Sequence, residues 1–141
     1  MALAARNSST ADIDGVPPVP AARFFRPASA VALRTDAEQI GAAIAAWLDE
    51  EWAPLPEHAE LGRAVAVAWE RRRATGDALE DDDVASVLLG VANDLLAGFD
   101  FGPTFTSAFD VANKAVELAM RRDGMEACDC SGGGGGGAGD V

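Results

Sequence analysis

Residues 35–52 read TDAEQIGAAIAAWLDEEW, and apolar side chains recur in them at the spacing of one helix face. The members of that face are Ile40, Ile44, Trp47 and Leu48. Residues 35–38 match a capping box, in which the Thr35 and Glu38 side chains satisfy free amides of the first turn. Residues 53–56, APLP, end the pattern because proline has no amide donor. We therefore expect a helix over residues 35–52.

Three further helix patterns follow along the chain. The second starts at Pro56, since proline suits a first helical turn, and runs to the arginines of residues 71–73. Its buried stripe is expected to be Leu61, Val65, Ala68 and Trp69. The third, from residue 84 to Gly98, is apolar nearly all round, so we expect it at the centre of the domain, touching the other three helices.

The fourth helix is expected to begin near Phe105 or Thr106 and to end at a Gly124 cap. The residues expected to face inward are Phe109, Ala112, Val116, Ala119 and Met120. On its outer face, Asp110 and Lys114 are spaced to form an ion pair. The sequence therefore predicts an all-α, four-helix bundle-like domain over residues 35–123, between a disordered leader (residues 1–34) and a disordered Cys/Gly-rich tail (residues 124–141).

Each of the first three helices contains one interior glycine: Gly41, Gly62 and Gly90. An interior glycine costs about 1 kcal/mol relative to alanine. Close approach of a neighbouring helix would compensate for that cost, whereas an exposed glycine would simply be tolerated. A bulky substitution separates the two interpretations, because it is severe only where another helix lies close.

Charge is distributed unevenly along the 141 residues, whose net charge is −12. Residues 1–34 carry +2 and residues 35–141 carry −14. A basic, alanine-rich leader ahead of an acidic domain is typical of an organelle transit peptide. Residues 19–22, VPAA, resemble a plastid processing site, and Phe24 and Phe25 stand between arginines. These features predict import into a chloroplast or plastid stroma; the alternative is a leader without an address and a cytoplasmic protein.

The composition also limits the kinds of partner. A strongly acidic chain is unsuited to nonspecific nucleic-acid binding. No run approaches the ~18 apolar residues that a membrane span requires, so we expect no span. The expected partner is another protein, of unknown identity, and the sequence does not predict the oligomeric state.

The chain lacks a recognisable catalytic or metal-binding set. His58 is the single histidine, and we expect it to face solvent in a first helical turn. Residues 80–83, EDDD, lack the alternating ligands and central glycine of a calcium loop. We interpret them as charge that the helix dipole favours at a helix start, or as an acidic knob for a basic partner. We therefore predict no enzyme activity, no metal and no cofactor.

The strongest candidates for partner binding are aromatic. Phe99, Phe101 and Phe105 lie in one short connection, where they either close the end of the core or anchor a partner. Trp52 is the tryptophan expected to be partly exposed, whereas Trp47 and Trp69 fall on buried stripes. The basic cluster Arg71, Arg72 and Arg73 either grips an acidic surface or remains solvated at a helix end.

The tail offers one further chemical candidate. Cys128 and Cys130 could form a strained, reducible disulfide, although the neighbouring acids disfavour a reactive thiolate. The sequence thus predicts a noncatalytic protein-binding or assembly module. The alternatives are a carrier of a small apolar ligand, such as a lipid or pigment, and a thiol redox accessory that uses Cys128 and Cys130.

Overall fold

The computed structural model describes residues 22–125, which form four long helices and one short one. They are α2 (Ala30–Glu51), α3 (Pro56–Arg73), α4 (Ala78–Asp81), α5 (Val84–Gly98) and α6 (Ala108–Arg122). The described part of the chain therefore confirms the predicted all-α, four-helix class. Residues 1–21 and 126–141 lie outside the described part, and most of the predicted leader and tail lies there.

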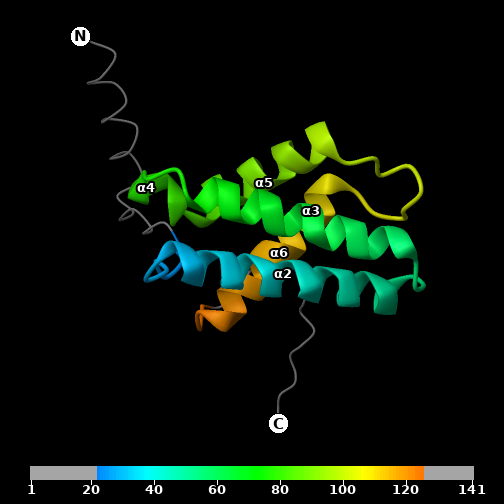
Figure 1. Cartoon of the computed structure of the whole chain (residues 1–141), viewed down its shortest axis with the longest axis horizontal. Coiled ribbons are helices and arrows are strands. Elements are labelled where there is room, and N and C mark those ends of the chain that lie inside the picture. The colour runs from blue at the N-terminus through cyan, green and yellow to red at the C-terminus, as the bar shows by residue number, and fades with distance from the viewer. Residues whose placement is uncertain (1–21, 126–141) are drawn as a thin grey trace, which may run out of the picture.

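The four long helices form a closed ring of neighbours. α2 packs against α3, α3 against α5, α5 against α6, and α6 against α2 (Figure 1). The core lies inside this ring and is filled by aliphatic and alanine side chains together with Phe24 and Trp69. Trp69 is fully buried, as its place on the apolar stripe predicts.

α2 and α3 approach closely because two glycines face each other. A Cβ atom built on Gly41 would lie 2.3 Å from the carbonyl oxygen of Gly62, and one on Gly62 would lie 2.5 Å from that of Gly41. Cβ atoms do not approach carbonyl oxygens so closely, so both positions require glycine. The close-approach interpretation is confirmed for this pair. Gly90 is also buried, but the atoms beside it belong to the Arg72 side chain rather than to a helix backbone.

The expectation that residues 84–98 form a central helix is wrong. α5 is one side of the ring, and its outer face exposes Leu89 and Leu96 at 57% and 69%. In a closed ring of four helices each helix keeps one face toward solvent, so α5 is not enclosed on all sides. Phe109, expected to face inward from α6, is also exposed, whereas Val111, two residues further along, is buried.

The N-terminal boundary also differs from the prediction. α2 starts at Ala30, capped by Ser29, whose hydroxyl accepts from the Ala32 amide at 3.1 Å. Thr35 therefore lies inside the helix and forms no capping box. The preceding residues 22–29, here called the N-terminal strap, continue across the domain to α4 and α5 (Figure 1).

The last helix begins and ends with its own caps. Ser107, rather than Phe105 or Thr106, precedes α6 and accepts from the Asp110 amide at 3.2 Å. Gly124 has a φ of 79° and lets the Met125 amide return to the Met120 carbonyl at 2.8 Å, which confirms the predicted glycine cap. The predicted Asp110–Lys114 pair does not form; Lys114 pairs with Glu117 at 3.4 Å.

Candidate functional site

Two polar or aromatic centres lie at opposite ends of the helical ring. One is a buried ionic network at the C-terminal end of α3, and the other is an aromatic surface where α2 ends and α6 begins. The residues that the sequence marked as candidates lie in one or other of these centres. The burial and contacts of each residue show whether its side chain is exposed at the surface.

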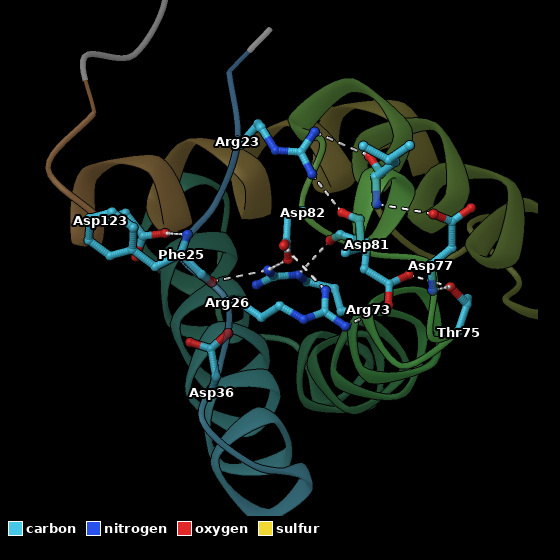
Figure 2. A network of polar contacts seen from close by, with 12 residues as sticks. Arg23, Phe25, Arg26, Asp36, Arg73, Thr75, Asp77, Asp81, Asp82 and Asp123 are labelled. Atoms are coloured by element: carbon cyan, nitrogen blue, oxygen red, sulfur yellow. Dashed lines mark hydrogen bonds and ion pairs between the residues drawn. The ribbon is translucent and has the colours of Figure 1, made fainter.

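Arg73 is the hub of the buried network, and only 3% of it is exposed. Its guanidinium donates to the Asp81 carbonyl oxygen at 2.9 Å, the Asp82 carboxylate at 2.9 Å and the Phe25 carbonyl oxygen at 3.2 Å (Figure 2). It also lies over the Phe24 ring, 5.0 Å from the centroid. Arg73 is therefore committed to the interior and is not free to grip a partner.

The acidic run of residues 80–83 belongs to the same network. Asp83 caps the start of α5, as the helix-start interpretation predicts, whereas Asp81 and Asp82 are buried and cannot form an acidic knob. Asp81 accepts from the Thr75 hydroxyl and from the Gly76 amide, the latter at 3.1 Å. A buried carboxylate requires such donors because desolvation penalises its charge. This run therefore closes the α3–α4 connection.

The N-terminal strap completes the network. The Phe24 amide donates to the Asp82 carbonyl at 2.7 Å, and Arg26 pairs with the Asp82 carboxylate at 3.2 Å. Arg23 reaches the Ala78 carbonyl oxygen at 2.6 Å (Figure 2). The Phe24 ring packs on Trp69 with centroids 5.5 Å apart. The strap thus fixes one end of the domain, a structural role that periodicity could not reveal.

The other two arginines of the predicted basic cluster meet one carboxylate. Arg72 donates to Asp94 through two nitrogens, at 2.8 and 3.2 Å, and Arg71 lies 3.7 Å from the same group. The hydrogen bond with Asp94 raises the pKa of Arg72 above its usual value. Residues 71–73 therefore divide between two separate contacts, Asp94 and the buried network, rather than forming one surface for an acidic ligand.

His58 is buried rather than solvent-facing, which corrects the prediction. Its Nδ1 lies 2.7 Å from an Asp49 carboxylate oxygen, and its Nε2 has no hydrogen-bond partner within residues 22–125. The Leu55 amide donates to the same Asp49 oxygen at 3.4 Å. The pair ties the start of α3 to the end of α2 and so orders the connection that carries Trp52.

The aromatic connection between α5 and α6 separates into two parts. Phe99 and Phe101 are half-buried, pack on the core and meet edge to face with centroids 5.0 Å apart. Phe105 is 64% exposed, and its ring lies 5.8 Å from that of Trp52, which is 52% exposed. The structure therefore brings together one phenylalanine and the tryptophan that the sequence marked as exposed, although they are far apart along the chain.

A shallow groove of about 290 Å³ lies beside this pair and is here called the aromatic groove. Its lining residues are Trp47, Glu51, Trp52, Thr106, Asp110, Asn113, Lys114 and Glu117. The Lys114 ammonium lies 5.4 Å from the centre of the Trp47 ring and 3.4 Å from Glu117. Sequence reasoning missed this contribution of α6. Phe109, which the sequence placed on the inward face of the same helix, is exposed and does not line the groove.

The aromatic groove is lined by two tryptophan rings, three carboxylates and one ammonium group. Residues 22–125 hold no cluster of three or more His, Cys, Asp or Glu side chains arranged for a metal ion. No helix in this range is both long and apolar enough to cross a membrane. Cys128 and Cys130, the redox candidates, lie outside the described residues.

The fold and the site together describe a small acidic helical domain with an exposed aromatic groove. The chain belongs to the family described as Domain of unknown function (DUF8822), whose model matches residues 19–123. That match includes the N-terminal strap and all five helices. No curated protein and no solved structure matches the chain.

Proposed function

We propose that this protein is a noncatalytic binding module that meets a partner protein through its aromatic groove. The observation that carries the proposal is the pair of neighbouring rings of Trp52 and Phe105 on the surface. Large aromatic side chains dominate the energetics of protein interfaces because they bury much apolar area at little entropic cost.

The positions of the two rings also support this function. Trp52 follows the last residue of α2, and Phe105 stands two residues before the Ser107 cap of α6. Both segments are anchored, the first by the Asp49–His58 contact and the second by Phe99 and Phe101 on the core. A surface held by such contacts is ordered before a partner arrives, so binding pays little ordering entropy.

A second candidate is binding of a small apolar ligand between α3 and α5. A depression of about 370 Å³ lies there, lined mainly by apolar groups that include Val67, Leu95 and Phe99. Its volume is at the lower end of the range for small-molecule sites, which begins near 300 Å³. A lipid or pigment that co-purifies with the protein would support this candidate.

The experiment that tests the proposal is co-purification of tagged full-length protein from its own cells. A Trp52→Ser, Phe105→Ser variant removes the exposed pair, and we expect it to lose a partner that the natural protein retains. A Phe25→Ser, Leu96→Ser variant is the matched control, since both of its side chains are exposed at other places on the surface. Circular dichroism and thermal melts establish that both variants are folded.

The outcomes separate the two candidates. Loss of a stoichiometric protein partner from the first variant alone supports the aromatic groove as the contact. Equal loss from both variants, or retention in both, contradicts it. If the natural protein carries an apolar small molecule and no protein, the α3–α5 depression becomes the site, and Val67→Ser should release the ligand.

A further inference from the structure

We infer that the partner at the aromatic groove is a cationic segment with apolar anchors, a Lys/Arg-rich amphipathic stretch of another protein. This inference rests on the proposed function. It concerns the charge that surrounds the two rings and the reason why that charge is unfavourable in the free protein.

The end of the molecule that carries the groove is almost uniformly acidic. Residues 47–60 and 99–114, which form this end, contain seven carboxylates and one amino group, that of Lys114. The α2–α3 turn and the α5–α6 connection lie at the same end of the ring (Figure 1). The arginines lie mainly elsewhere, in the N-terminal strap and at the ends of α3 and α6.

The end of α2 is charged against its own helix dipole. A helix C-terminus favours cations, and α3 and α6 follow this rule with arginines in their last turns. α2 instead ends in Asp49, Glu50 and Glu51, and its last turn has no basic residue. Asp49 is bound to His58, whereas Glu50 and Glu51 have no hydrogen bond or ion pair with any residue of the described range. Two carboxylates therefore stand at a negative pole without a counter-charge.

A cationic partner would supply that missing charge. Its Lys or Arg side chains would meet Glu51 and Asp110 in the groove and Glu50, the residue before Glu51 in α2. Its apolar side chains would cover Trp52 and Phe105. The one amino group of the groove, that of Lys114, already lies between Trp47 and Glu117 and does not oppose such a partner.

The chain's own remaining segments do not fit this surface. Residues 1–21 hold Arg6 against Asp12 and Asp14, a net charge of −1. Residues 126–141 hold three acids and no base, a net charge of −3. Two copies meeting groove to groove would place acid against acid. Charge complementarity therefore favours a different protein.

The test uses full-length protein and three fluorescent 18-residue peptides. One alternates Lys and Leu at helical spacing, the second has Glu in place of Lys, and the third has Lys and Ser without apolar residues. Fluorescence anisotropy of the peptides and tryptophan emission of the protein, to which the exposed Trp52 contributes, report binding. We expect the Lys/Leu peptide alone to bind, with affinity that falls as salt rises. Loss of both rings in Trp52→Ser, Phe105→Ser should weaken binding at least about tenfold.

The decisive variant is Glu50→Gln, Glu51→Gln. It should weaken the Lys/Leu peptide and yet raise the thermal midpoint of the free protein, because it removes charge from the negative end of a helix. Unfolding cannot produce this opposite pair of effects. Glu38→Gln, Glu80→Gln is the matched control, since it changes the net charge equally and leaves the acidic end intact.

Several results would overturn the inference. They are equal binding of the Lys/Ser peptide, an equal effect of the control variant, preference for the Glu/Leu peptide, and no binding of any peptide. None of these results removes a partner found by co-purification, so the proposed function can survive them. Self-association at rising concentration that is lost with Trp52→Ser, Phe105→Ser would point instead to a second copy as the occupant.

Discussion

The contact between Gly41 and Gly62 gives a quantitative prediction about the helix pair that carries Trp52. Gly41→Ala adds one methyl group whose carbon would lie 2.3 Å from the Gly62 carbonyl oxygen and 3.1 Å from the Ala66 methyl. Since the closest atom belongs to backbone, no side-chain rotation relieves the contact. α2 and α3 must move apart by about 0.7–1 Å, which weakens every dispersion contact along their interface.

The magnitude follows from two opposing effects. Overpacking of this kind costs about 1–3 kcal/mol, whereas alanine gains about 1 kcal/mol over glycine in helix propensity. Because the obstructing atom is backbone, the cost should lie in the upper part of that range, at about 2–3 kcal/mol, and we expect a net loss of about 1–2 kcal/mol in the free energy of unfolding. In a domain of this size such a loss lowers the thermal midpoint by about 5–10 °C.

Two other glycines provide an internal scale for this prediction. Gly90→Ala places its methyl carbon 2.6 Å from Cδ of Arg72, a side chain that can move by giving up Asp94, so its loss should be smaller. Gly98→Ala meets no atom within 4 Å and should be neutral or slightly stabilising. Urea unfolding of the three variants checks the order. Full stability of Gly41→Ala, or a larger loss for Gly98→Ala than for the other two variants, would contradict the close helix contact at Gly41.

Three further predictions concern the strap and its network. Phe24→Ala should cost about 3–5 kcal/mol in urea unfolding, because the ring is buried against Trp69, whereas Phe25→Ala should stay within about 0.5 kcal/mol; equal effects would contradict the packing. Arg73→Met should cost about 3 kcal/mol in urea unfolding because it leaves the buried Asp82 with one partner fewer. The double variant Arg73→Met, Asp82→Asn should lose less stability than the sum of the two single variants; additive losses would contradict the contact. If a plastid leader is removed on import, the mature chain should start at or before Arg23, since loss of Phe24 would open the core; intact-mass measurement checks this, and a mature start beyond Phe24 would contradict it.

Periodicity predicted the features that depend on neighbours along the chain. The helix that begins at Pro56, the burial of Trp69 and the exposure of Trp52 follow from helical spacing and proline, and all three are observed. The close approach at Gly41 could also be anticipated, because a glycine among alanines needs a reason. These features require no knowledge of what lies across the domain.

The missed features all depend on contacts between distant segments. Arg73 was interpreted as a solvated or partner-binding charge and Asp82 as charge at a helix start, because nothing in a local pattern indicates that each is the other's partner. His58 read as exposed for the same reason, since its partner Asp49 stands in the preceding helix. The all-round apolar pattern of α5 was misread as burial. In this short ring its outer leucines remain on the surface.

The charges at the helix C-termini bear on both the stability of the domain and its proposed function. α3 and α6 end in arginines that offset the negative pole of each helix, and α2 ends in three carboxylates that add to it. A stabilising replacement there would be simple, since a single Lys in place of Glu51 would contribute about 0.3–1 kcal/mol. An arrangement that lowers the stability of the free domain beside two exposed aromatic rings is therefore better explained by an absent cation than by packing. The basic partner that we infer would supply the counter-charge that the end of α2 lacks.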